Sequence, residues 1–181
     1  EDFRYFWEDV ANNKELSPTG PPSELIVDGK LPEFKVLDST TVRYSWASPN
    51  PEFLARLAGA SPLLIYRPAH YLKKFHDKYS KATEAQANNQ RRPWSAVHNK
   101  MDNMYRFDNP DLPTLQPWMN IVRPPADRFV AVRNPYFHRV DDAGRQLPYI
   151  DRVEMVIAND KLIAAKAGAG EADLQARGLQ F

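Results

Sequence analysis

The sequence has 181 residues, a formal net charge of +1 and no cysteine. Its length is enough to bury a hydrophobic core, and its hydrophobic content of 43% is that of a folded chain rather than a disordered one. The near-neutral charge gives no reason to expect nucleic acid or an anionic membrane as a partner, and the lack of cysteine excludes a disulfide framework and thiol catalysis.

The chain is expected to open with an amphipathic helix over Asp2–Val10. Apolar residues at positions i, i+3, i+4 and i+7 share one face of a helix. The four residues at these positions are Phe3, Phe6, Trp7 and Val10. Packing in the core is their expected role, since large aromatic side chains usually bury their area. Arg4, Glu8 and Asp9 are expected to face away from the core.

A β-hairpin is predicted over Phe34–Trp46. Its strands are expected at Phe34–Leu37 and Thr40–Trp46, joined by a turn at Asp38-Ser39. Apolar and polar residues alternate along the second strand, which is typical of a strand with one buried face.

Three further helices and a short strand follow. Pro51 suits the first turn of a helix. The expected buried face of that helix consists of Phe53, Leu54 and Leu57. An apolar strand is expected at Leu63–Tyr66, and a helix from Pro68 to Phe75. Helical spacing then recurs at Trp94, Val97, Met101 and Met104.

The last part of the chain carries the clearest strand signals. Trp118–Val122 is expected to be extended, and strands are predicted at Arg128–Arg133 and Arg152–Ala158. Asn134-Pro135 ends the middle strand, because proline has no N–H for a ladder and restrains the residue before it. Asp141–Gly144 has the composition of a turn.

The alternation of strands and helices predicts an α+β fold, with a mostly antiparallel mixed sheet and packed helices. Asp160 is expected to cap a final helix over Lys161–Lys166. The strand residues expected to be largely buried are Val42, Tyr44, Trp46, Val130, Val132, Val153, Met155 and Ile157.

The sequence shows no recognisable catalytic or metal-binding pattern. None of the four histidines (His70, His76, His98 and His138) has the i, i+4 partner of a helical zinc site. Each is expected to lie at the surface or to be hydrogen-bonded. No P-loop, Gly-x-Ser-x-Gly or Gly-x-Gly-x-x-Gly motif occurs, and Asp141-Asp142 is expected to be a solvated turn. We therefore predict no catalytic residue, no metal site and no cofactor.

Tryptophans are the residues that a ligand is most expected to use, by stacking on the indole ring. Trp7 and Trp46 have periodic settings that favour a place in the core. Trp94 and Trp118 lie beside proline-rich loops, and they are the candidate ligand-binding residues. A structural role is the alternative for both.

Three segments carry a resemblance to a known family. They are Arg133–Phe137 (RNPYF), Gln146–Val153 (QLPYIDRV) and Ala169–Leu174 (AGEADL). In this order and spacing they resemble the family 5 extracellular solute-binding proteins, the peptide- and oligopeptide-type receptors of bacterial ABC importers.

The resemblance implies a two-lobed receptor, located in the periplasm or outside the cell, that closes on a peptide or other small molecule. It implies the permease subunits of an ABC transporter as partners, and binding without bond chemistry. Residues 1–181 are interpreted as a fragment of the N-terminal lobe, without a second domain. No motif transfers the family's ligand contacts to individual residues here.

Other interpretations remain open at this point. A small α+β enzyme domain and a protein-interaction module are the alternatives. No run reaches the roughly 18 apolar residues of a membrane span, so no span is expected. The chain opens on Glu1 within a helical pattern and stops at Phe181 within an apolar segment, so we expect it to be a piece of a longer protein.

Overall fold

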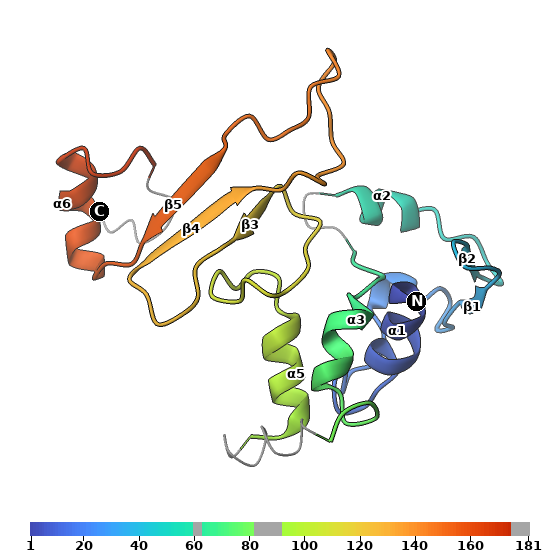
Figure 1. Cartoon of the computed structure of the whole chain (residues 1–181). Helices are drawn as coiled ribbons and strands as arrows, with labels where there is room; N and C mark the ends of the chain where they lie inside the picture. The colour runs from blue at the N-terminus through green and yellow to red at the C-terminus, as the bar shows by residue number, and fades with distance from the viewer. Residues whose placement is uncertain (60–62, 82–91, 175–181) are drawn as a thin grey trace. The chain divides into compact units, whose positions relative to one another are not determined.

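The computed structural model of the chain describes residues 1–59, 63–81 and 92–174. The chain divides into two compact units, Glu1–Asn103 and Met104–Phe181 (Figure 1). Each unit is described by itself below.

The first unit begins with a helix that changes its winding. The α-helix α1 (Asp2–Tyr5) continues as the π-helix η1 (Phe6–Ala11), in place of the uniform helix predicted. Asp9 is only 5% exposed, so the prediction that it faces away is wrong. The wider π turn shifts which positions face inward compared with a period of 3.6 residues.

The predicted hairpin is confirmed. Strands β1 (Glu33–Val36) and β2 (Val42–Ser45) pair antiparallel, with Phe34 opposite Tyr44. Asp38 closes the turn, because its carboxylate accepts from the backbone N–H of Thr40 at 2.8 Å. Trp46 lies one residue beyond β2.

A hydrophobic core joins the first helix, the hairpin and the segments that follow. Its buried members are Phe6, Ala11, Leu25 and Ile65. Partly buried side chains packed against them are Phe3, Trp7, Tyr44, Trp46, Phe53, Leu57 and Leu63. Leu25 ends the short 3-10 helix η2 (Ser23–Leu25).

Two predictions for the middle of this unit are wrong. Helix α2 (Phe53–Ala58) leaves Leu54 74% exposed, because a short helix packed through Phe53 and Leu57 turns Leu54 outward. Residues 63–66 form no strand. The backbone N–H of Leu63 bonds the carbonyl of Arg56 at 2.9 Å instead of joining a ladder.

Among the described residues of the first unit, three further helical segments follow. Helix α3 (Ala69–Leu72) follows Pro68 as predicted and continues as the 3-10 helix η3 (Lys73–Phe75). Helix α5 (Trp94–Asp102) buries Val97 and His98 and packs against α3 and η3. It ends before Met104, which was expected to extend its apolar face.

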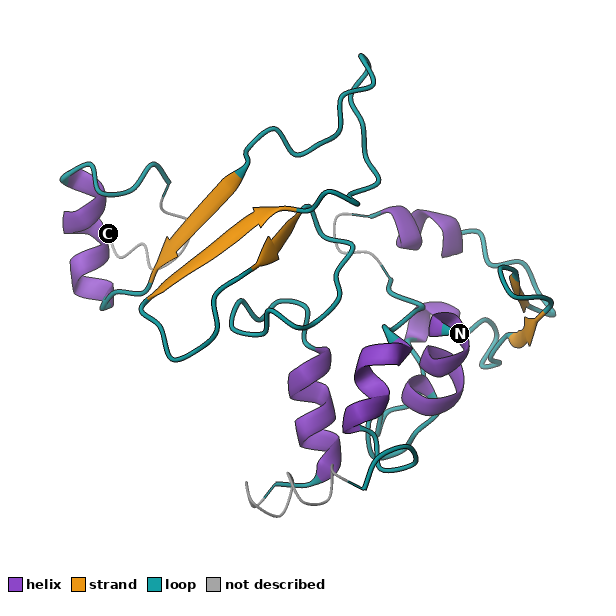
Figure 2. Cartoon of the chain, viewed as in Figure 1, coloured by secondary structure: helices purple, strands orange, loops and turns teal. Residues whose placement is uncertain are grey.

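The second unit is built on a three-stranded antiparallel sheet (Figure 2). The strands are β3 (Trp118–Asn120), β4 (Arg128–Arg133) and β5 (Arg152–Val156), in the order β3-β4-β5. The central strand contributes most of the buried residues, with Phe129 2%, Val130 7% and Ala131 8% exposed. The two sheets are antiparallel and accompany helices, so the predicted α+β class is confirmed.

Burial on the strands is less complete than the sequence predicts. Met155 is 37% and Ile157 is 54% exposed, and those two predictions are wrong. Val42, Tyr44, Trp46, Val132 and Val153 are half-buried, and Val130 is buried. β5 is an edge strand. Alternation of apolar and polar residues indicates which side chains share a face of a strand, but it does not indicate whether another element covers that face.

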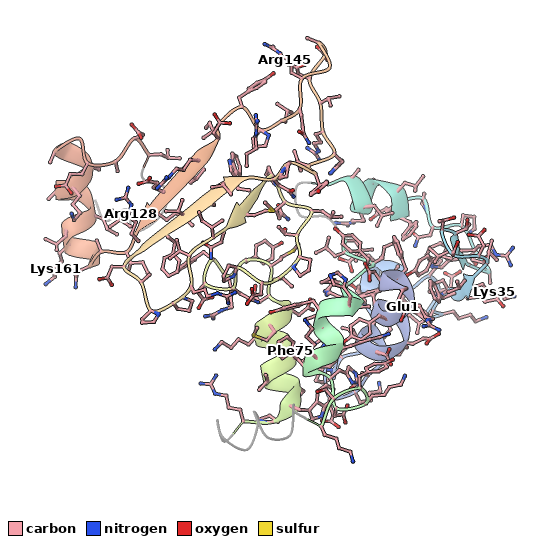
Figure 3. The ribbon with its side chains drawn as sticks, in the orientation of Figure 1. Glu1, Lys35, Phe75, Arg128, Arg145 and Lys161 are labelled. Atoms are coloured by element: carbon pink, nitrogen blue, oxygen red, sulfur yellow. The ribbon has the colours of Figure 1, made fainter. Side chains whose placement is uncertain are left out.

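A long connection joins β4 to β5, and Figure 3 shows Arg145 at its tip. Asn134 anchors its base: the buried amide donates to the carbonyls of Thr114 and Gln116 at 3.2 and 2.9 Å. At the tip, Asp141 accepts from the backbone N–H of Arg145 at 2.8 Å, and Gly144 has a φ of 77°. The predicted turn is confirmed.

Helix α6 (Asp160–Gly168) follows β5. Its N-cap is Asn159, whose side chain accepts from the backbone N–H of Lys161 at 3.1 Å. The predicted cap at Asp160 is therefore wrong by one residue. Asparagine and aspartate are about equally good N-caps, so residue type alone does not distinguish these two neighbours.

Candidate functional site

Trp94, one of the two predicted ligand residues, begins α5 directly after Pro93. Its ring lies against the imidazole of His76, with ring centroids 4.6 Å apart and planes inclined by 47°. The side chain is half-buried. Part of the indole is thus used for packing within the first unit, and part lies at the surface.

Two buried histidines lie beneath Trp94. His76 is 2% and His98 is 0% exposed. His98 Nε2 lies 2.8 Å from the hydroxyl of Tyr5. His76 Nδ1 accepts from the backbone N–H of Lys78 at 3.2 Å, so Nε2 is the atom that donates to the carbonyl of Asp9, at 3.1 Å. Both rings are hydrogen-bonded, as predicted, whereas His70 and His138 are exposed.

Asp9 completes this cluster from the first helix. Its two carboxylate oxygens accept from Lys78 Nζ and from the Tyr79 hydroxyl, each at 2.6 Å. Burial alone would raise the pKa of Asp9, but the bonds from Lys78 and Tyr79 outweigh it and the pKa is lowered. Sequence reasoning missed Asp9, Tyr5 and Tyr79. The available signal was the i, i+4 spacing of Tyr5 and Asp9 on one side of a helix.

Arg67 and Asp102 form an ion pair near His98. Arg67 Nε donates to Asp102 at 2.7 Å, and the Arg67 guanidinium lies 5.4 Å from the centre of the Phe6 ring. Burial raises the pKa of Asp102 despite this partner. Burial also lowers the pKa of His98 to about 4, and the nearby His76 and Arg67 add to that effect.

Most polar groups of the cluster bind one another, whereas Nδ1 of His98 is buried without a hydrogen-bond partner among the described residues. The carboxylates of the cluster accept from Lys78, Tyr79 and Arg67. Such a network stabilises the packing of the elements that it joins. The imidazole of His76, against which the indole of Trp94 packs, is therefore held in place by hydrogen bonds.

Trp118, the second predicted ligand residue, belongs to the other unit. It begins β3 opposite Arg133. Its indole N–H donates to the carbonyl of Ile150 at 3.0 Å, which ties β3 to the connection between β4 and β5. The side chain is half-buried, so the ring face rather than the N–H is the part available for stacking.

The described residues hold neither a metal-binding cluster nor a membrane-spanning helix. Over residues 1–59, 63–81 and 92–174, no three His, Asp or Glu side chains come together as a metal site would require. Within the same part of the chain, no helix combines the length and apolar character needed to cross a membrane.

Comparison with known proteins shows a similarity to a periplasmic binding protein. The chain is 28% identical over 176 residues to the periplasmic alpha-galactoside-binding protein of Rhizobium meliloti (strain 1021), a match that covers 94% of this chain and 23% of that protein.

The chain is also similar to solved structures of binding proteins. The oligopeptide-binding protein OppA matches with a TM-score of 0.73 and 34% identity, over 96% of this chain and 27% of that one. The periplasmic binding protein MelB of Agrobacterium fabrum C58, in complex with stachyose, matches with a TM-score of 0.65 and 26% identity, over 95% of this chain and 24% of that one. The chain thus spans about a quarter of the length of each of these relatives.

The family model that matches describes the bacterial extracellular solute-binding proteins, family 5 Middle, and its match extends over residues 1–180. This is nearly the whole chain, and it includes the three segments that carry the sequence resemblance. The chain belongs to family 5 of the bacterial extracellular solute-binding proteins.

Proposed function

We propose that this chain is part of the substrate-binding component of a bacterial ABC importer, which captures a solute outside the cytoplasm. The match of the family model over residues 1–180 carries the proposal. The relatives are named as binding proteins, which supports binding without bond chemistry. The location is the periplasm or the cell exterior, and the partners are the solute and the permease subunits of the importer.

The proposed solute is a peptide or an oligosaccharide. The names of the relatives support both classes, since OppA is an oligopeptide-binding protein and the other two are named for an alpha-galactoside and for stachyose. Trp94 and Trp118 are proposed as stacking surfaces. An aromatic ring packs against an apolar peptide side chain or a sugar ring without needing the indole N–H, which in Trp118 is already bonded.

The proposed mechanism is enclosure of the solute as two lobes close by hinge bending. Residues 1–181 are proposed to belong to the N-terminal lobe. A chain that supplies one side of the site makes at most about half of the contacts. Half of roughly −8 kcal/mol, the binding free energy of a micromolar complex, corresponds to about millimolar affinity.

Isothermal titration calorimetry tests this proposal on two proteins, the full-length receptor and the 181-residue chain. The titrants are stachyose and a set of di- to pentapeptides. We expect one solute class to bind the full-length receptor with micromolar or tighter affinity, and the 181-residue chain to bind it about a thousandfold more weakly.

Two outcomes would contradict the proposal in different ways. If the full-length receptor binds neither class, the proposed solutes are wrong. If the 181-residue chain alone binds a solute more tightly than about 10 μM, the site is self-contained and enclosure between lobes is not its mechanism.

A further inference from the structure

Two buried imidazoles lie where α5 meets the rest of the first unit. The rings of His76 and His98 have centroids 5.8 Å apart and are nearly perpendicular, at 89°. His98 is on α5, and His76 directly follows η3, against which α5 packs. The charge of these two rings therefore bears directly on whether α5 stays in place.

His76 lies beside a partly exposed carboxylate. Its Nδ1 accepts from the backbone N–H of Lys78 and lies 3.1 Å from a carboxylate oxygen of Asp77, a residue whose side chain is 44% exposed.

His98 has no carboxylate of this kind beside it among the described residues, and the neutral side chain of Asn99 favours its charged form less than burial disfavours it. The two interior carboxylates near the pair already have cationic partners: Asp9 bonds Lys78 at 2.6 Å, and Asp102 bonds Arg67 at 2.7 Å. A charged His98 would be fully buried, and a buried charge without a partner is costly.

The two tyrosine hydroxyls of the cluster, those of Tyr5 and Tyr79, stay neutral in acid. Burial raises the pKa of Tyr5 and, together with the bond to Asp9, that of Tyr79. Neither hydroxyl therefore supplies a negative charge to a protonated His98.

We propose that His98 is an acid-sensitive latch: its neutral ring, bonded to Tyr5, holds α5 against the first helix, and its protonation releases α5 together with Trp94. This goes beyond solute binding, because it concerns the conformation of the first unit and holds whichever solute is bound.

The expected pH dependence follows from linkage. Burial lowers the pKa of docked His98 to about 4, whereas a solvated histidine titrates near 6.5. Because the docked value is the lower one, docking is fully favoured above about pH 6.5 and is lost as the pH falls toward 4. The ratio of released to docked α5 should rise about 30-fold between about pH 7.5 and about pH 5.

Amide hydrogen exchange of the full 181-residue chain tests the latch. After correction for the intrinsic rates, protection of the amides of Val97–Met101 should fall about 30-fold between those two pH values. Protection of the β4 amides should change much less. In the variant His98→Gln, whose amide can still bond the Tyr5 hydroxyl but cannot titrate, the pH-dependent fall should disappear.

The matched control is His70→Gln, the same substitution at an exposed histidine on α3, and it should behave like the parent chain. An equal fall of protection in His98→Gln, or no fall in the parent chain, would overturn the latch. If His98→Gln does not fold, an NMR titration of the parent chain decides instead. A His98 pKa below about 5 supports the latch, and a value at or above about 6.5 refutes it.

Discussion

The hydroxyl of Tyr79 lies 2.6 Å from a carboxylate oxygen of Asp9, across 70 positions of the sequence. The other carboxylate oxygen of Asp9 accepts from Lys78 Nζ. This one buried side chain therefore ties the first helix to the segment that follows η3.

Replacing Asp9 by asparagine should destabilise the first unit. The amide group keeps the shape of the carboxylate, but its NH2 end cannot accept from both Lys78 and Tyr79. We expect the free energy of unfolding to fall by about 1–3 kcal/mol, the cost of leaving a buried polar group without its partner. Urea denaturation followed by circular dichroism measures it.

The matched control is Glu8→Gln, the same chemical change on the neighbouring, exposed residue. It should alter stability by less than about 0.5 kcal/mol. Equal effects of the two substitutions would show that the contacts of Asp9 contribute nothing specific.

Tyr44 and Tyr5 give opposite predictions for the same substitution. The buried hydroxyl of Tyr44 has no hydrogen-bond partner among the described residues, whereas that of Tyr5 bonds His98 at 2.8 Å. Tyr44→Phe should leave stability unchanged or raise it by about 1 kcal/mol, and Tyr5→Phe should lower it by about 1 kcal/mol. Thermal denaturation of both variants checks the sign, and a loss in Tyr44→Phe as large as that in Tyr5→Phe contradicts the assignment.

Asn134 should be the most sensitive polar residue of the β4–β5 connection. Its amide donates to the carbonyls of Thr114 and Gln116, and its oxygen accepts from the backbone N–H of Tyr136. Asn134→Ala removes all three bonds and should destabilise the second unit by about 2–3 kcal/mol. Denaturant unfolding monitored through Trp118 fluorescence measures this loss.

Asp142→Ala serves as the control in the same connection, because Asp142 is exposed. It should change the unfolding free energy by less than about 0.5 kcal/mol. If Asn134→Ala were equally mild, the connection would be held by its other bonds and not by this amide.

Leucine substitutions separate a binding role of the tryptophans from a packing role. In the full-length receptor, Trp94→Leu and Trp118→Leu keep apolar volume but remove the ring, and each should weaken solute binding about tenfold. Trp7→Leu, at a ring packed against Phe34 with centroids 5.7 Å apart, should lower stability and leave affinity unchanged. Calorimetric titration with matched melting curves measures both quantities, and unchanged affinity in both Trp94→Leu and Trp118→Leu would remove these residues as ligand contacts.

Local patterns in the sequence were enough to predict most of the regular elements. The hairpin at β1 and β2 and the strands β4 and β5 follow from alternation of apolar residues, and short-range chemistry ends them. Asp38 bonds the backbone of Thr40 two residues later, and Asn134-Pro135 stops a ladder. Interactions of this range depend on neighbours in the chain, so the sequence contains all the information that they need. The three segments Arg133–Phe137, Gln146–Val153 and Ala169–Leu174, taken together, likewise indicated the family from the sequence alone.

The tertiary structure decided what those elements cover. Asp9 is buried because Lys78 and Tyr79 reach it from 69 and 70 positions away, and Tyr5 meets His98 across 93 positions. Conversely, Leu54 and Ile157 are exposed although their spacing indicated burial. A periodic pattern states which side chains share a face of a helix or strand. Whether that face meets solvent, a core or a buried polar partner depends on how distant segments pack, and no local pattern records that arrangement.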